Sequence, residues 1–250
     1  MKRLYALLVV AFMAITPSLS AQSASFYNAT RDAEKMIKQM PTHNYYRAYV
    51  GYNSAHVNWK DYGLVGEMMY PIKSGITLGY LESRHVWKGL PLFVEYGANI
   101  QCLYGKEDLR EIALIGHSYK ANIVSLNIPV NAAFRLSFEN DTIAVTPFAG
   151  LNFRLNIAGS RTDEYALAGE VYSDTIKLFD SSNDENAAGA GGAFNRFQVG
   201  LNLGFAVTYK VYTLSVSRVA DISKLANIHN GAFDDKGRLG VTTIALGYAF

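Results

Sequence analysis

The sequence of 250 residues lacks several features that would place it in a common class of protein. It contains one cysteine, Cys102, so no internal disulfide framework can form. Beyond the first residues there is no run of 18 apolar side chains, which excludes a transmembrane helix. Neither sign of charge is in marked excess, because 23 basic residues are balanced by 21 acidic ones and the formal net charge is only +2. A strongly basic surface for nucleic acid is therefore not indicated.

The first 21 residues have the pattern of a secretory signal peptide. Lys2 and Arg3 precede an apolar stretch over residues 4–15, and Leu19-Ser20-Ala21 offers small residues for cleavage. Removing residues 1–21 takes away two basic side chains and no acid, so the mature chain has a formal net charge of zero. We therefore expect an exported protein that has no nucleic-acid partner.

The sequence is rich in an alternation of large apolar residues with small or polar ones. Half of its residues are hydrophobic, and it has 17 tyrosines and 13 phenylalanines. This period of two indicates strands whose two faces differ chemically. Eight strands are expected, at about 45–57, 75–87, 91–104, 120–138, 143–157, 195–209, 211–220 and 239–250.

The second strand departs from the alternation. Ile76, Leu78 and Tyr80 belong to its bulky face, but Glu82 and Arg84 then follow in the same phase. A β-bulge near Leu81 would move these two charges to the other face. We therefore expect a bulge at that point.

The connections between the expected strands alternate in length. Long connections span 58–74, 105–119, 158–194 and 221–238, whereas the short ones are 88–90, 139–142 and residue 210. Such an order is typical of an up-and-down meander in which one rim is elaborated. The expected domains are a signal peptide (1–21), a periplasmic N-terminal segment (22–44) and a β-barrel (45–250).

The bulky faces must lie either inside a soluble barrel or outside, against lipid. An eight-stranded barrel has little interior room, and on the order of four or more large apolar side chains per strand exceed it. The opposite faces carry glycine, asparagine, serine, alanine and a few arginines, which suits a crowded polar interior. Aromatic residues also lie near the strand ends, as an interfacial girdle requires. We therefore predict an all-β fold, an eight-stranded antiparallel up-and-down transmembrane β-barrel, with a short N-terminal periplasmic helix.

The chain ends on the alternating strand GVTTIALGYAF. Phe250 and Tyr248 belong to its bulky face, and Gly247 keeps the opposite face clear. This ending resembles the C-terminal signal of outer-membrane barrels, which the barrel-assembly machinery reads. The resemblance implies that Phe250 lies at the periplasmic rim and that the last strand closes the barrel against the first.

Three segments carry a wider resemblance. ANIVSLNIPVNAAFRLSFENDTIAVTPFAGLNFRLNIAG at 121–159, NRFQVGLNLGF at 195–205 and the terminal strand are similar to the outer-membrane β-barrel domain family of Gram-negative bacteria, the OmpA/OmpX/PorT-like small barrels. The resemblance spans residues 45–250 and implies an outer-membrane location with long loops outside and both termini in the periplasm. The family has no shared catalytic residues that could be carried over.

Charged residues on the inward faces are candidates for a polar interior. These are Arg47, Glu95, Arg135, Arg154 and Arg196. A buried charge needs a partner, so we expect Glu95 to pair with Arg135 or Arg47 across the lumen. Such pairs would make a structural plug, while the alternative is a narrow selective channel.

An outer-membrane enzyme acting on lipid A is the rival function. It would need a nucleophile, a base and carboxylates at the outer rim. His117 and Ser118 lie there, but adjacent strand residues point to opposite faces. The other histidines are scattered without the spacing of a metal site. We therefore expect no catalytic residue, no metal and no cofactor.

The long connection at 158–194 is acidic over residues 161–185. Its carboxylates either bind divalent cations that also bridge lipopolysaccharide, or form a solvated surface loop. Residues 28–40 predict a short amphipathic helix that ends before Pro41. The expected partners are outer-membrane lipid, lipopolysaccharide and the assembly machinery. The expected role is structural support of the membrane or binding through the outer loops.

Overall fold

The computed structural model describes residues 43–60, 69–87, 90–108, 117–138, 141–167, 170–179, 194–230 and 233–250. The expected signal peptide and the helix expected over residues 28–40 lie outside this part of the chain. Among the residues described, no helix has the length and apolar character needed to cross a membrane.

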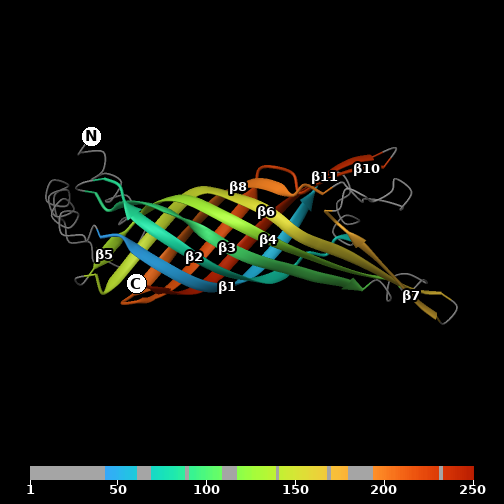
Figure 1. The fold of residues 1–250 in the computed structure, drawn as a ribbon, viewed down its shortest axis with the longest axis horizontal. Helices are drawn as coiled ribbons and strands as arrows, with labels where there is room; N and C mark the ends of the chain where they lie inside the picture. Colours follow the sequence, from blue (N-terminus) through green and yellow to red (C-terminus); the bar gives the residue numbers. More distant parts are fainter. Residues whose placement is uncertain are drawn as a thin grey trace, which may run out of the picture.

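The described chain is built almost entirely from strands (Figure 1). In chain order they are β1 (Tyr45–Trp59), β2 (Ser74–His85), β3 (Leu92–Asp108), β4 (His117–Phe134), β5 (Leu136–Phe138), β6 (Ile143–Leu167), β7 (Glu170–Lys177), β8 (Phe197–Tyr209), β9 (Tyr212–Asp221), β10 (Ala226–Asn230) and β11 (Phe233–Ala249). Strands β5 and β7 pair with β6, and β10 pairs with β11.

The remaining strands form a closed antiparallel ring. Its order is β1, β2, β3, β4, β6, β8, β9 and β11, and β11 closes it against β1 from Arg47↔Ala249 to Trp59↔Gly237. Closure leaves no open edge along the wall of the barrel, so backbone groups in the wall pair within the molecule. The predicted eight-stranded up-and-down barrel is confirmed.

The stagger of the strands follows from directly opposed residues. A path around the ring leaves β6 at Ala149 and returns to it at Ser160, 11 residues further on. It passes through Leu203, Arg218, Thr242, Ser54, Ser74, Tyr104 and Asn122. One of the 11 residues is Ile157, which a bulge opposite Val124 and Ser125 leaves without an opposed residue. Such a stagger in an eight-stranded ring corresponds to a strand tilt of about 40°.

The large apolar side chains face outward. Leu78 is 67% exposed, Leu203 is 58% exposed and Leu246 is 66% exposed. The residues between them, such as Thr77 and Asn202, are buried in the barrel. The orientation predicted from the alternation is therefore confirmed, and the barrel presents an apolar wall with a largely polar interior.

The bulge expected near Leu81 is absent. The pairing of β2 with β1 and with β3 runs without a shift through Tyr80, Leu81 and Glu82. Glu82 and Arg84 thus stay on the outer wall, where Arg84 Nε donates to Glu82 Oε1 at 2.6 Å. Both lie at the short-turn end of β2, so their polar ends lie near the interface, where charges are tolerated better than at mid-membrane.

The two ends of the barrel differ. At the short-turn end, Asp141 and Lys210 turn the chain with φ of 69° and 55°, values that asparagine and aspartate adopt more readily than most residues. At the other end several strands run beyond the expected limits, with β6 reaching Leu167 instead of residue 157. The outer parts of β3, β4, β6 and β7 form a sheet that projects from the barrel (Figure 1). We call this the projecting sheet.

Candidate functional site

The interior of the barrel is divided into layers, beginning at the short-turn end. There the rings of Tyr45 and Phe93 meet edge to face at 5.5 Å between centroids, and both belong to a buried apolar cluster with Ala133 and Phe148. Glu95 is fully buried beside this cluster. Its Oε1 accepts hydrogen bonds from Tyr45 Oη at 2.9 Å and from Ser83 Oγ at 3.0 Å.

The two arginines of this layer have different partners. Arg47 Nη2 lies 3.8 Å from Glu95 Oε2, so of the two pairings considered from sequence the structure contains the one with Arg47. Arg135 instead donates to Asp141 Oδ1 at 3.0 Å, and its guanidinium lies 4.6 Å from the centre of the Tyr45 ring. Asp141 belongs to the short connection 139–142. Arg135 stands between β4 and β5, and Ser137 Oγ donates to the same oxygen of Asp141 at 2.7 Å.

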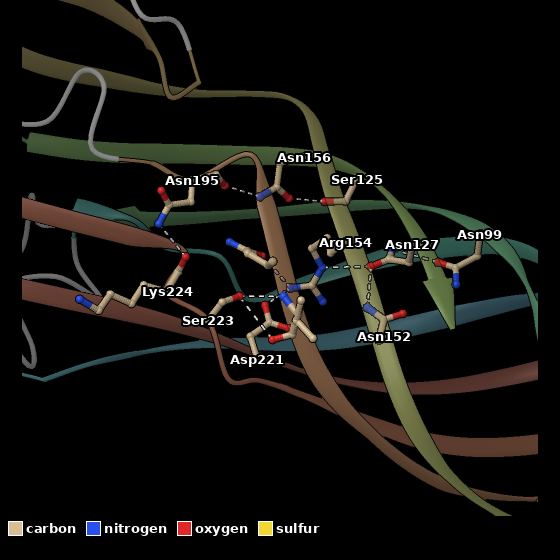
Figure 2. A network of polar contacts seen from close by, with 12 residues as sticks. Asn99, Ser125, Asn127, Asn152, Arg154, Asn156, Asn195, Asp221, Ser223 and Lys224 are labelled. Carbon is tan, nitrogen blue, oxygen red and sulfur yellow. Dashed lines mark hydrogen bonds and ion pairs between the residues drawn. The ribbon is translucent and has the colours of Figure 1, made fainter. Parts of the chain in front are cut away.

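The middle layer is centred on Arg154, which is 1% exposed (Figure 2). Its Nη1 donates to Asp221 Oδ2 and, at 3.3 Å, to Gln198 Oε1. Its Nε donates to Asn127 Oδ1 at 3.1 Å, and Asn127 in turn donates to Asn99. One buried cation thus links β3, β4, β6, β8 and β9 across the lumen. Polar groups at this depth need partners, and this network supplies them for most of its atoms, although Gln198 Nε2 and Asp221 Oδ1 have none among the described residues.

A small cavity lies beside this network. Its volume is about 60 Å³, and its lining includes Arg47, Arg154 and several asparagines. The side-chain oxygens of Gln101 and Asn202, both residues of the lining, have no hydrogen-bond donor among the residues that the structure describes. A polar cavity of this size has room for a few waters, which would satisfy such groups. It is far too small for a drug-sized ligand.

The layer at the long-loop end is apolar. Inward residues of the strands, among them Val57, Trp59 and Leu239, pack against residues of the connections. The connections contribute Tyr70, Ile72, Leu178, Phe179, Phe194 and Leu225. Tyr70 lies at the centre, with ring centroids 5.5 Å from Trp59 and 4.9 Å from Phe194. We call this cluster the apolar plug, and with the layers below it closes the lumen.

Arg196 lies outside the lumen, although the sequence placed it among the interior charges. Its side chain is exposed, and it donates to the carbonyl oxygens of Ile157 at 3.2 Å and Phe179 at 2.7 Å. It precedes the first residue of β8, so the inward direction expected from strand alternation does not hold there. These two hydrogen bonds join the residue before β8 to β6 and to the residues that directly follow β7.

The residues of the terminal strand lie at the short-turn rim. The backbones of Phe250 and Tyr46 exchange two hydrogen bonds of 2.9 Å, and their rings stack at 5.9 Å. Tyr248 lies beside them on the outer wall. Gly247 faces inward, where a Cβ atom would approach Arg47 Cγ to 3.1 Å. The part these residues play in barrel assembly remains a prediction.

The projecting sheet carries its own side-chain clusters. His117, Tyr165 and Tyr172 lie directly opposite one another on β4, β6 and β7. The ring centroids of His117 and Tyr165 are 5.5 Å apart, and those of Tyr165 and Tyr172 are 5.4 Å apart, with interplanar angles of 29° and 15°. We call this row the aromatic stack. It ends at Tyr172, at the edge of the sheet.

The other face of the projecting sheet is charged. Ser118 Oγ donates to Glu164 at 3.2 Å, and Lys120 donates to the same carboxylate. The hydrogen bond from Lys120 holds the pKa of Glu164 below its usual range. His117 and Ser118 thus serve opposite faces of the sheet.

The acidic residues of this region do not converge on one point. Among the residues described, no group of three or more metal-ligating side chains occurs. Asp163 is held by Arg161 through hydrogen bonds of 2.8 and 2.7 Å, and Glu170 accepts from Tyr172 Oη at 2.8 Å. Asp174 is exposed on β7, and the other carboxylates of the expected acidic stretch, Asp180, Asp184 and Glu185, lie outside the described residues.

Sequence reasoning missed Asp221, Asp141 and the apolar plug. Asp221 and Asp141 stand just beyond the expected end of a strand or in a short turn, where alternation gives no direction. Part of the apolar plug could have been predicted from the sequence. The inward residues near the long-loop ends of three strands are apolar, namely Val57, Leu103 and Ile123. Phe179 and Phe194 could not have been predicted to lie in the plug, because they belong to a connection whose sequence does not alternate between apolar and polar residues.

Comparison with known proteins gives similarity at the level of structure only. No family model and no curated protein matches the sequence. Ail, the attachment invasion locus protein of Yersinia pestis, is 15% identical with a TM-score of 0.38, over 83% of this chain and 99% of that one. OprG from Pseudomonas aeruginosa is 11% identical with a TM-score of 0.39, over 85% and 98%. A major outer membrane protein from Thermus thermophilus is 11% identical with a TM-score of 0.40, over 83% and 100%.

At such identities no residue or role is transferred from these proteins. The class of this chain rests on its own geometry: a closed ring of strands, an apolar outer wall and an interior of buried polar groups. A soluble protein would not present so continuous an apolar surface, and in lipid a closed barrel satisfies the backbone. The chain folds as a small eight-stranded β-barrel whose apolar outer wall suits contact with lipid.

Proposed function

We propose that this protein acts by binding at the cell surface, with the long connections outside the cell and both termini in the periplasm. The binding element is the projecting sheet, and the partner is an extended polypeptide segment that adds a strand to β7. The observation that carries the proposal is the exposed edge of β7 beyond the barrel wall. No catalytic step is part of this function.

The edge of β7 supports strand addition. In the part of the sheet that the structure describes, β7 pairs only with β6, so its other edge has no neighbouring strand. Every residue of β7 except Ile176 is exposed, and Val171 is 71% exposed. Exposed edges of this kind offer unpaired backbone groups to another chain. Peptides that bind by strand addition use these groups for affinity and side-chain contacts for specificity.

The aromatic stack suggests which side chains the partner carries. Because the row His117–Tyr165–Tyr172 ends at the edge strand, an aromatic residue opposite Tyr172 would extend it by one ring. Glu170 and Asp174 flank Tyr172 at the neighbouring positions on the same face, so basic residues at the opposed positions complement them. The partner is therefore an extended segment with an aromatic residue between basic ones.

The rival functions have less support. His117 and Ser118 point to opposite faces and are engaged by Tyr165 and Glu164, so they do not form a nucleophile and base. Steady conduction would require an open lumen, but Arg154 and the apolar plug fill it. These contacts favour binding over a lipid A enzyme or a channel.

Trimming the hairpin tests the proposal. The variant replaces residues 164–173 by Asn-Gly, which joins the opposed residues Asp163 and Asp174 through a two-residue turn. Purified barrels are then used to select from a random peptide display library. We expect the full chain to enrich alternating peptides with an aromatic residue between basic ones, and the trimmed variant to retain less than a tenth of their binding.

A matched control is Phe197→Ala, which alters an exposed residue on the membrane wall and leaves β7 intact. It is expected to bind the selected peptides like the full chain. Equal binding to the trimmed variant would rule out the outer half of β7, with Tyr172, as the site.

A further inference from the structure

One charged residue stands on the lipid-facing wall near mid-membrane. Arg218 is an outward residue of β9, exposed, and directly opposed to Leu203, the central residue of β8. It lies six residues along β9 from Tyr212 at the short-turn rim. On a tilted strand this raises it by about 15 Å, well within an apolar belt about 25 Å tall.

Such a position is costly without a partner. Arginine on the lipid face of a barrel destabilises it most near the bilayer midplane, and an ionisable residue at this depth is by default a candidate for a function. Along the neighbouring part of the wall, the described outward residues of β8, β9 and β1, and those of β11 from Arg238 to Ala249, include no carboxylate. The wall itself therefore offers Arg218 no anion.

Gly240 shows where the guanidinium of Arg218 lies. A Cβ atom at Gly240 would be 3.8 Å from Arg218 Nη2 and 3.7 Å from the carbonyl oxygen of His56. Gly240 is opposed to Ala220, two residues beyond Arg218 toward the long-loop end. The side chain thus extends toward that end of the barrel, as a long cationic side chain does to reach the interface.

Gly240 is also the meeting point of other polar outward residues. It is directly opposed to His56 on β1, and Arg238 precedes it by one outward step on β11. Thr242 follows it on the same face and is opposed to Ser54. Since a Cβ atom at Gly240 would meet no other described atom within 4 Å, the surface between these residues is open.

We propose that the open surface at Gly240 binds a phosphate group of lipid A in the outer leaflet. The side chains around it that would contact the phosphate are those of Arg218, Arg238 and His56. Two guanidinium groups and an imidazole match the charge and hydrogen-bonding capacity of a phosphate. Leu203 and Ile244, exposed below them on the wall, lie where the acyl chains of that molecule would run. Lipid A carries both phosphate groups and acyl chains, and it lies in the leaflet that the long-loop end occupies. The site thus rests on the proposed orientation of the barrel.

The test measures binding of diphosphorylated lipid A to the purified barrel in zwitterionic detergent micelles, by native mass spectrometry over a concentration series. For the double variant Arg218→Gln with Arg238→Gln, we expect at least tenfold weaker binding. Gly240→Leu leaves all charges in place but fills the open surface at Gly240 with a side chain, and it is expected to weaken the binding of lipid A similarly. Lipid A stripped of phosphate should bind the unaltered chain no better than diphosphorylated lipid A binds the double variant.

Arg84→Gln is the matched control, because Arg84 is also an exposed arginine of the outer wall but lies at the short-turn end. It should bind diphosphorylated lipid A like the unaltered chain. Equal loss in Arg84→Gln, undiminished binding in the double variant, or equally tight binding of phosphatidylglycerol would each overturn the proposal. The proposal would also be overturned if the barrel formed a dimer that Arg218→Gln dissociates while the binding of lipid A is unchanged.

This measurement uses isolated barrels, so it does not depend on which end faces outward in the cell. Labelling of Tyr172→Cys in intact cells with a membrane-impermeant maleimide, in a Cys102→Ser background, reports the orientation separately. Surface labelling together with unchanged lipid A binding in the double variant would overturn the lipid A site alone. Tyr172→Cys that is labelled only after the cells are broken would overturn the proposed orientation.

Discussion

Replacing Arg154 by alanine is expected to lower the free energy of unfolding by about 3–5 kcal/mol. The change leaves Asp221, itself buried, without its cation. The carboxylate also lies directly over Gly200, where a Cβ atom would come within 2.6 Å of Asp221 Oδ1, so there is little room for it to turn away. The measurement is urea unfolding of the barrel refolded in lipid vesicles, followed by tryptophan fluorescence.

The stability of Arg154→Ala should be compared with that of the double variant Arg154→Met with Asp221→Leu. Removing both charges together avoids a lone buried ion, and replacing a buried pair by apolar residues is often nearly neutral. We therefore expect the double variant to be more stable than Arg154→Ala. If Arg154→Ala lost less than about 1 kcal/mol, the pair would not be the electrostatic centre of the interior.

Replacing Phe194 by alanine is expected to lower the free energy of unfolding by about 3–5 kcal/mol. Phe194 is 6% exposed and packs against Tyr70 at 4.9 Å and Phe179 at 6.1 Å between ring centroids. Its loss leaves a cavity in the apolar plug. Trp59→Ala should have a similar effect, and the two changes together should cost less than their sum because both rings contact Tyr70.

Val171→Ala provides the control for this series, because Val171 is exposed on β7 and its truncation is expected to change stability by less than about 0.5 kcal/mol. Planar-bilayer recordings complete the test. Phe194→Ala should remain without steady conductance, since Arg154 and its partners still fill the lumen below the plug. An unfolding free energy unchanged by Phe194→Ala would mean that the plug contributes nothing to the fold.

The barrel could be predicted from sequence because its signal is repeated in every strand. Along β8 the apolar residues Leu201, Leu203 and Phe205 alternate with Asn202 and Gly204, and the same period recurs around the ring. Closure then follows from the number of strands and the short turns. The outer ends of β3, β4 and β6 were less predictable, because beyond the membrane both faces of a strand meet water and the alternation fades.

The interior contacts were less accessible to the sequence. That Glu95 faces inward follows from alternation, but the choice between Arg47 and Arg135 depends on the stagger of the strands, which no single strand reveals. Arg196 shows the same limit from the other side, since one residue before a strand the period no longer sets a direction. Glu82 and Arg84 show that a break in an apolar pattern can mark the interface of the membrane and need not mark a bulge.

The orientation of the side chains is the claim on which the other conclusions rest. It is tested most directly by single nitroxide labels at Leu203→Cys and Asn202→Cys, each in a Cys102→Ser background, with the barrel in a lipid bilayer. The account predicts that the label at position 203 relaxes strongly with oxygen and weakly with a water-soluble nickel complex, as in hydrocarbon, whereas the label at 202 is shielded from oxygen in the lipid. Hydrocarbon-like relaxation at 202 together with a shielded label at 203 would contradict it.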